Sequence, residues 1–107
     1  MTNTSSVRVA AVQATACPFD TSRAVEIVCA MTSEAAKEGA RLILFPEAYV
    51  GGYPWGLAFG TAVGGRSEVG RRVFGRYWES AIDVPGPEVE RICQVAEDFG
   101  VWLCVGV

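Results

Sequence analysis

The sequence contains no histidine and only one lysine, Lys37, among its 107 residues. Without histidine, Ser-His-Asp and Cys-His catalysis are excluded within this chain, because the imidazole base is missing. Most zinc sites are excluded as well, since the cysteines are far apart and form no CxxC pair. We therefore expect no metal and no other cofactor. We interpret the four cysteines as reduced, buried, small hydrophobic residues, namely Cys17, Cys29, Cys93 and Cys104.

Long hydrophobic runs are also lacking. No apolar stretch approaches the roughly 20 residues that a membrane-spanning helix requires. The first residues show no basic region followed by a long apolar core, so we expect no signal peptide and a cytoplasmic location. The net charge of -3 argues against nucleic acid and anionic membranes as partners. Half of the residues are apolar, which is typical of a folded globular domain.

The first half of the chain predicts a strand, a helix and a second strand. After a polar tail at residues 1–6, the apolar segment Val7–Gln13 is interpreted as a largely buried strand. Asp20, or one of the two residues after it, can cap a helix that runs to about Glu38 with one apolar stripe. Arg41–Phe45 predicts a short apolar strand. This order predicts a parallel βαβ unit with a right-handed crossover.

The second half predicts a long loop, two helices and a third strand. Gly51–Gly65 contains six glycines and shows neither helical nor strand periodicity, as functional loops often do. Ser67–Ala81 has a helical stripe, which two internal glycines weaken by about 1 kcal/mol each. Pro87 suits the first position of another helix and Gly100 its end. The apolar segment Val101–Val107 predicts the last strand.

This last strand indicates an incomplete domain. A parallel strand that is apolar on both faces needs a covering layer on each side, and an unpaired edge promotes aggregation. Three strands and two or three helices do not supply that cover. We therefore expect residues 7–107 to be the first part of a larger domain, and we expect the isolated chain to be marginally stable or to associate.

A single carboxylate, Glu47, follows the second predicted strand. Ligands of α/β folds bind at the carboxyl ends of the strands, so this residue is a candidate site residue. The apolar strand should partly desolvate the carboxylate, and desolvation favours the protonated form, which suits a general base near neutral pH. A structural role, in which Glu47 caps the loop or pairs with an arginine, fits the same position.

Four aromatic residues lie close to this glutamate along the chain. They suit either the walls of a pocket for a small organic substrate or the packing of the loop, and the pattern alone does not separate the two. They are Tyr49, Tyr53, Trp55 and Phe59. A different class of function, a non-catalytic βαβ module that binds phosphate, would use the glycines of Gly60–Arg66. The spacing of those glycines fits neither GxGxxG nor the P-loop.

The segment GARLILFPEAYVGGYPWG, residues 39–56, resembles the first signature of the nitrilase branch of the carbon–nitrogen hydrolases. Four further segments agree with that family: VRVAAVQA near the start, FG at residues 59–60, RRVFGRYWESAIDVPGPEVE at residues 71–90, and GVWLCVGV at the end. The resemblance covers the chain from Val7 onward. It implies an α/β fold in which residues 7–107 are the N-terminal part of a four-layer αββα sandwich.

The resemblance also implies a Glu-Lys-Cys catalytic set. Glu47 matches the family's general base, which activates the cysteine thiol. The thiolate attacks the nitrile carbon to give a thioimidate, water attacks, ammonia leaves, and hydrolysis of the acyl-enzyme yields a carboxylic acid. Tyr53 is expected near the substrate pocket. The implied partners are a small nitrile and, in the full-length form, further copies of the same protein.

The family's lysine and cysteine have no counterpart among these residues. Their usual sequence contexts lie later in the family's chain than Val107. Lys37 lies on the polar side of the first predicted helix, and Cys104 is interpreted as a core residue. We therefore expect the parent enzyme to hydrolyse nitriles and these 107 residues alone to be inactive. The alternative is an amidase or a cyanide-converting member of the same superfamily.

Overall fold

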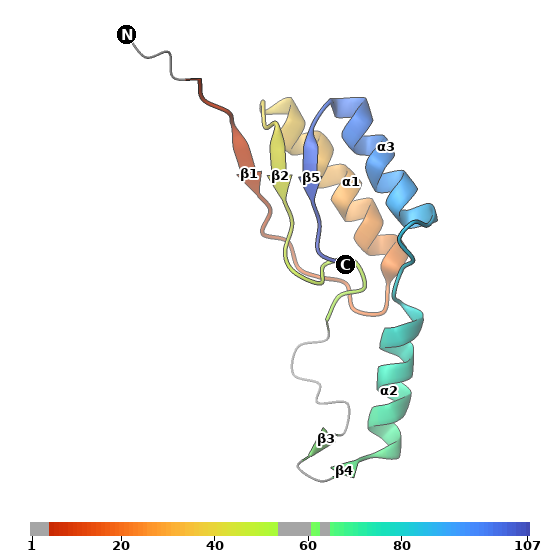
Figure 1. Ribbon diagram of the computed structural model, residues 1–107. Helices are drawn as coiled ribbons and strands as arrows, with labels where there is room; N and C mark the ends of the chain where they lie inside the picture. Colours follow the sequence, from red (N-terminus) through yellow and green to blue (C-terminus); the bar gives the residue numbers. More distant parts are fainter. Residues whose placement is uncertain (1–4, 54–60, 63–64) are drawn as a thin grey trace.

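The computed structural model describes residues 5–53, 61–62 and 65–107. Within these residues the chain forms β1 (Val9–Ala11), α1 (Thr21–Lys37), β2 (Leu42–Leu44), β3 (Thr61–Ala62), β4 (Gly65–Arg66), α2 (Glu68–Glu79), α3 (Pro87–Phe99) and β5 (Trp102–Cys104). Figure 1 shows β1, β2 and β5 side by side, with α1 and α3 packed together next to them and α2 extending beyond the ends of the strands. The mixed α/β class predicted from the sequence is confirmed.

The three longer strands form one parallel sheet in the order β1-β2-β5. Val9 lies opposite Leu42, and Leu42 lies opposite Trp102. The predicted parallel βαβ unit is therefore confirmed. Its strands are shorter than predicted. An apolar pattern indicates which residues are buried, not which residues pair with a neighbouring strand: Val12 and Val105 pack against the core although they lie outside the paired strands.

Capping residues explain where the helices begin and end. At the start of α1, the carboxylate of Asp20 accepts a hydrogen bond of 3.1 Å from a backbone N–H of the first turn. At the start of α2, the hydroxyl of Ser67 accepts one of 3.0 Å from the N–H of Gly70. Pro87 is the first residue of α3, and Gly100, at φ +62°, ends it. The predictions for Asp20, Pro87 and Gly100 are confirmed.

The core lies on one face of the sheet. Val28 of α1, Ile43 of β2 and Ile92 of α3 are buried there and pack together. Side chains alternate along a strand, so every second residue points to the other face. That face is uncovered in the described part of the chain, and Trp102 on it is 79% exposed. The prediction that Val7–Gln13 is largely buried is therefore wrong, because only one of its two faces is covered.

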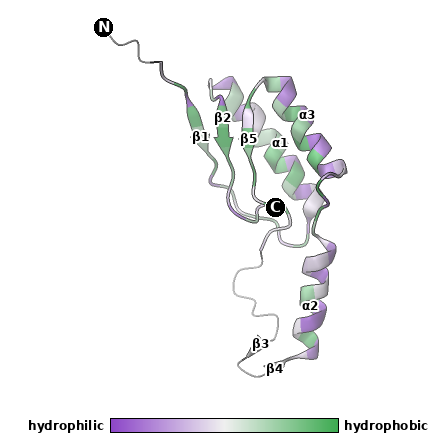
Figure 2. Cartoon of the chain, in the orientation of Figure 1, coloured by the Kyte–Doolittle hydropathy of each residue, from purple (hydrophilic) through white to green (hydrophobic). Residues whose placement is uncertain are grey.

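We call this second face the uncovered sheet face. Figure 2 shows that its strands are strongly apolar. It is formed by two rows of paired residues, Val9, Leu42 and Trp102 in one and Ala11, Leu44 and Cys104 in the other. Since Cys104 is exposed on this face and Cys93 is exposed on α3, the prediction that all four cysteines are buried is wrong for these two.

The segment between β2 and α2 is only partly described. The sequence predicts a loop without strands over Gly51–Gly65, but β3 and β4 pair antiparallel there, which corrects that prediction. Strands of two residues are too short to produce an alternating pattern. The predicted helix over Ser67–Ala81 is confirmed as α2. No helix in the described ranges has both the length and the apolar character that a membrane span requires.

Candidate active site

The predicted general base lies where the sequence places it, at the carboxyl edge of the sheet. β2 ends at Leu44, and Glu47 follows three residues later in the turn 47–52. Between them, the N–H of Phe45 donates a hydrogen bond of 2.8 Å to the carbonyl oxygen of Cys104, which extends the contact between β2 and β5. Pro46 then ends the pairing because it has no N–H to donate. The chain can therefore leave the sheet at once and present Glu47.

Several segments hold the turn that carries Glu47. The N–H of Val50 donates to the carbonyl oxygen of Gly106 at 3.0 Å. The hydroxyl of Tyr49 donates to the carbonyl oxygen of Thr15 at 3.3 Å. Ala48 has φ +48°, a left-handed conformation that residues other than glycine, asparagine and aspartate seldom adopt. Such a conformation persists where surrounding contacts impose it, so the turn has a defined shape.

A hollow of about 450 Å³ opens beside the turn. In the described part of the chain, its lining residues are Pro46, Glu47, Ala48 and Tyr53. The structure thus brings together the two site residues predicted from sequence, Glu47 and Tyr53. Pro46 and Ala48 were not predicted as lining residues, and neither carries a polar side chain that could have identified it. The volume is suited to a small organic molecule.

The environment of Glu47 differs from the prediction. The residue is exposed, so the desolvation expected from the apolar strand is not provided by the described residues. The reason is that Glu47 lies beyond the sheet, where no second layer covers it. Among the arginines whose side chains the structure describes, none forms an ion pair with Glu47: the ion pairs join Arg23 to Glu26 and Arg72 to Glu68. The predicted structural alternative of an arginine pair therefore gains no support.

The aromatic residues near Glu47 divide between the core and the hollow. Tyr49 is fully buried, and its ring lies 5.9 Å from that of Phe45 between centroids. Burial, and secondarily the nearby Cys17, raises the pKa of the Tyr49 phenol. Tyr53 is 45% exposed and meets the ring of Tyr77 edge-on at 5.8 Å. Trp55 and Phe59 lie outside the described residues.

The lysine and cysteines of this chain do not join Glu47 in the hollow. Lys37 is exposed in the last turn of α1, as predicted for the polar side of that helix. Cys17 and Cys29 are half-buried, and none of the four cysteines is among the lining residues that the structure describes. Among the described lining residues, Glu47 is therefore the only one of the three residue types that the resemblance implies for a Glu-Lys-Cys set.

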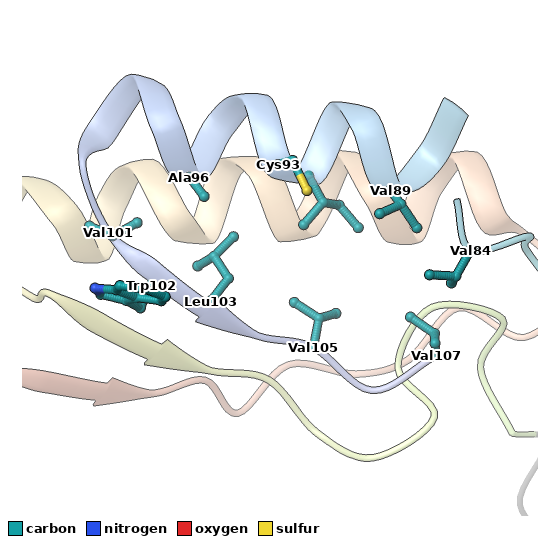
Figure 3. A pocket seen from close by; sticks show the side chains of 10 residues that line it. Val84, Val89, Cys93, Ala96, Val101, Trp102, Leu103, Val105 and Val107 are labelled. Carbon is teal, nitrogen blue, oxygen red and sulfur yellow. The ribbon is translucent and has the colours of Figure 1, made fainter. Parts of the chain in front are cut away.

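Further hollows lie away from Glu47, and two of them differ clearly in polarity. One, of about 400 Å³, runs between α3 and residues 101–107, where Cys93 and Ala96 face Leu103 and Val105 (Figure 3). Its lining is apolar, and the thiol of Cys93 is the one titratable group among the described lining side chains. The other, of about 320 Å³, is polar and lies at the start of α1, where the guanidinium of Arg76 stacks 4.4 Å above the ring of Phe19.

The described residues of Gly60–Arg66 do not support the phosphate-binding alternative. They belong to the antiparallel pair of β3 and β4 rather than to a glycine loop between a parallel strand and a helix. At the start of α2, the N–H of Gly70 is already bonded to the hydroxyl of Ser67. A phosphate loop needs its amides free to bind the ligand.

Comparison with known proteins identifies the family of this chain. Residues 8–107 match the family Carbon-nitrogen hydrolase. The chain is 44% identical over 105 residues to a bifunctional nitrilase/nitrile hydratase of Nicotiana tabacum, which covers 98% of this chain and 30% of that protein. It is 48% identical to Nitrilase 3 of Arabidopsis thaliana, over 95% of this chain and 30% of the relative. A nitrilase of Bradyrhizobium diazoefficiens is 43% identical, over 92% and 31%.

These relatives are plant and bacterial nitrilases, and the chain spans about 30% of their length. The family match extends over nearly all of the chain, including the turn of Glu47 and the strands on either side of it. The chain belongs to the carbon–nitrogen hydrolase family.

Proposed function

We propose that this chain is part of a longer nitrilase, in which Glu47 acts as the general base. The full-length protein would convert a nitrile to a carboxylic acid and ammonia. The observation that carries the proposal is the position of Glu47, which lines a hollow at the carboxyl edge of the sheet and forms no ion pair with any side chain that the structure describes. The nitrilases among the relatives support the substrate class.

In the proposed reaction, Glu47 accepts the proton of a cysteine thiol that the full-length protein contributes. The thiolate adds to the nitrile carbon, and the nitrile nitrogen takes up a proton to give a thioimidate. Water adds to this carbon, ammonia leaves, and a second water hydrolyses the thioester to the acid and the free thiol. A lysine, also contributed by the full-length protein, stabilises the negative charge that develops on the substrate. Tyr53 forms part of the pocket wall.

We also propose that the full-length protein covers the uncovered sheet face and forms the four-layer αββα sandwich. Support comes from the two apolar rows on that face and from the relatives, which are about three times as long as the matched region. The same cover would close the hollow beside Glu47. Partial removal of water from the carboxylate would then favour proton transfer near neutral pH.

The test is nitrile hydrolysis by the full-length protein and its Glu47→Gln variant. Glutamine keeps the size of the side chain but cannot accept the thiol proton, so kcat should fall by about 10² to 10⁴. Glu97→Gln, an exposed glutamate on α3, is the matched control and should leave kcat unchanged. Acid, amide and ammonia are all measured, because one relative is named as both a nitrilase and a nitrile hydratase.

A panel of nitriles, amides and cyanide separates this proposal from its alternatives. Turnover of amides or cyanide with no nitrile turned over would identify a different activity of the same superfamily. The isolated 107-residue chain should release no ammonia, since losing the nucleophile removes nearly all rate enhancement of a covalent mechanism. Ammonia release by the isolated chain, abolished by Glu47→Gln, would contradict this part.

A further inference from the structure

A glycine near the end of the chain lies directly against the backbone of the turn that carries Glu47. A Cβ atom added to Gly106 would lie 2.5 Å from the backbone nitrogen of Ala48 and 2.5 Å from the carbonyl oxygen of Pro46. It would lie 2.8 Å from the carbonyl carbon of Glu47 itself. Cβ atoms in proteins essentially never come within 3.0 Å of such atoms. All three atoms belong to the backbone, so no side-chain rotation can relieve the contact.

The opposite side of the turn is held as closely. The hydroxyl of Tyr49 donates to the carbonyl oxygen of Thr15, in the segment between β1 and α1. Gly52, at φ +60°, brings the end of the turn against the same segment, where an added Cβ would lie 2.9 Å from the nitrogen of Pro18. Glu47 therefore lies in a turn fixed from two sides, by residues 15–18 and by Gly106.

We propose that Gly106 and Tyr49 are positioning residues for Glu47, which hold the backbone of its turn where the carboxylate can reach the thiol. The proposal rests on the function proposed above. Neither residue lines the hollow, so neither would contact substrate. Their effect is on the direction in which Glu47 leaves the backbone, and a displacement of about 1 Å in a catalytic group can lower a rate 10²-fold.

The experiment is a kinetic comparison in the full-length protein of Gly106→Ala with Gly75→Ala. Both add one methyl group to a glycine, but at Gly75, in α2, an added Cβ meets no atom within 4 Å. Gly106→Ala should lower kcat about tenfold or more while KM changes by less than about threefold. It should also shift the acid-side midpoint of the pH–rate profile, because the carboxylate then lies in altered surroundings. Gly75→Ala should change none of these values.

Tyr49→Phe supplies the second arm, because it removes one hydroxyl and leaves the ring in the core. It should lower kcat about threefold or more with little change in KM. If Gly106→Ala is not obtained as folded protein, Tyr49→Phe alone decides. The proposal would be overturned if every variant that folds has a kcat within about twofold of that of Gly75→Ala and the same acid-side pH midpoint. A wild-type protein that hydrolyses no nitrile would instead refute the proposed function and the positioning role with it.

Discussion

Replacing Trp102 with alanine in the full-length protein tests whether a second layer covers the uncovered sheet face. Trp102 has the largest side chain on that face, is 79% exposed, and lies in register with Leu42 and Val9. If the face is buried in the full-length protein, this side chain becomes part of a core. Its removal should then leave a cavity there.

The structure sets the size of the expected effect. A tryptophan buries at most about 250 Å² in a core, so the 79% of Trp102 that is exposed here corresponds to about 200 Å². At roughly 25 cal/mol per Å², covering it stabilises the fold by about 5 kcal/mol. Measured losses for removing a large aromatic side chain from a core are about 3–5 kcal/mol. We therefore expect Trp102→Ala to lower the free energy of unfolding by about 3–5 kcal/mol.

The assay is urea unfolding of the full-length protein, followed by circular dichroism. Trp78→Ala is the matched control, since Trp78 is 72% exposed on α2 and lies outside the sheet. If Trp78 remains at the surface, its removal should change stability by less than about 1 kcal/mol. A loss below about 1 kcal/mol for Trp102→Ala would refute the covering layer, because a side chain that stays in water has little to lose.

Three further predictions concern the described residues and use the full-length protein. Thr32→Val should raise the free energy of unfolding by about 1 kcal/mol in thermal unfolding, because the fully buried Thr32 hydroxyl has no hydrogen-bond partner among the described residues; a loss would indicate a partner elsewhere. Ser67→Ala should lower it by about 1 kcal/mol by removing the cap of α2, whereas equal melting curves would show that the cap contributes nothing. Because burial raises the pKa of Tyr49, the unfolded phenol loses its proton first as the pH rises past about 10. The stability that is present below that pH is therefore lost as the pH rises further. Tyr49→Phe should reduce this loss, measured as the fall in melting temperature from about pH 8 to 11. An equal fall in wild type and variant would contradict the prediction.

The helices could be predicted from the sequence because their signals are local. Asp20, Pro87 and Gly100 act through hydrogen bonds and backbone angles within a few residues, so the sequence near each helix end contains the whole cause. The position of Glu47 could be predicted for a related reason. An apolar strand that meets Pro46 must end, and the next residues lie at the carboxyl edge of the sheet.

Exposure could not be predicted in the same way, because it depends on layers that contact the chain from outside. Cys104 ends β5 and Glu47 follows β2, strands whose apolar patterns resemble those of buried strands, yet both residues are exposed in the described structure. The left-handed conformation of Ala48 also gave no signal, since alanine does not favour it. It is imposed by contacts between segments far apart in the sequence.

The backbone hydrogen bond between Val50 and Gly106 has a consequence for biosynthesis. The two residues lie 56 positions apart, so the ribosome makes the segment with Glu47 well before the partner that fastens it. While the nascent polypeptide is shorter than this, the turn of Glu47 lacks the anchor at Gly106 and is held by its contacts with residues 15–18. The turn is therefore held from both sides only once β5 and the residues after it have been made, and a stalled translation product that ends before Gly106 would carry Glu47 without that anchor.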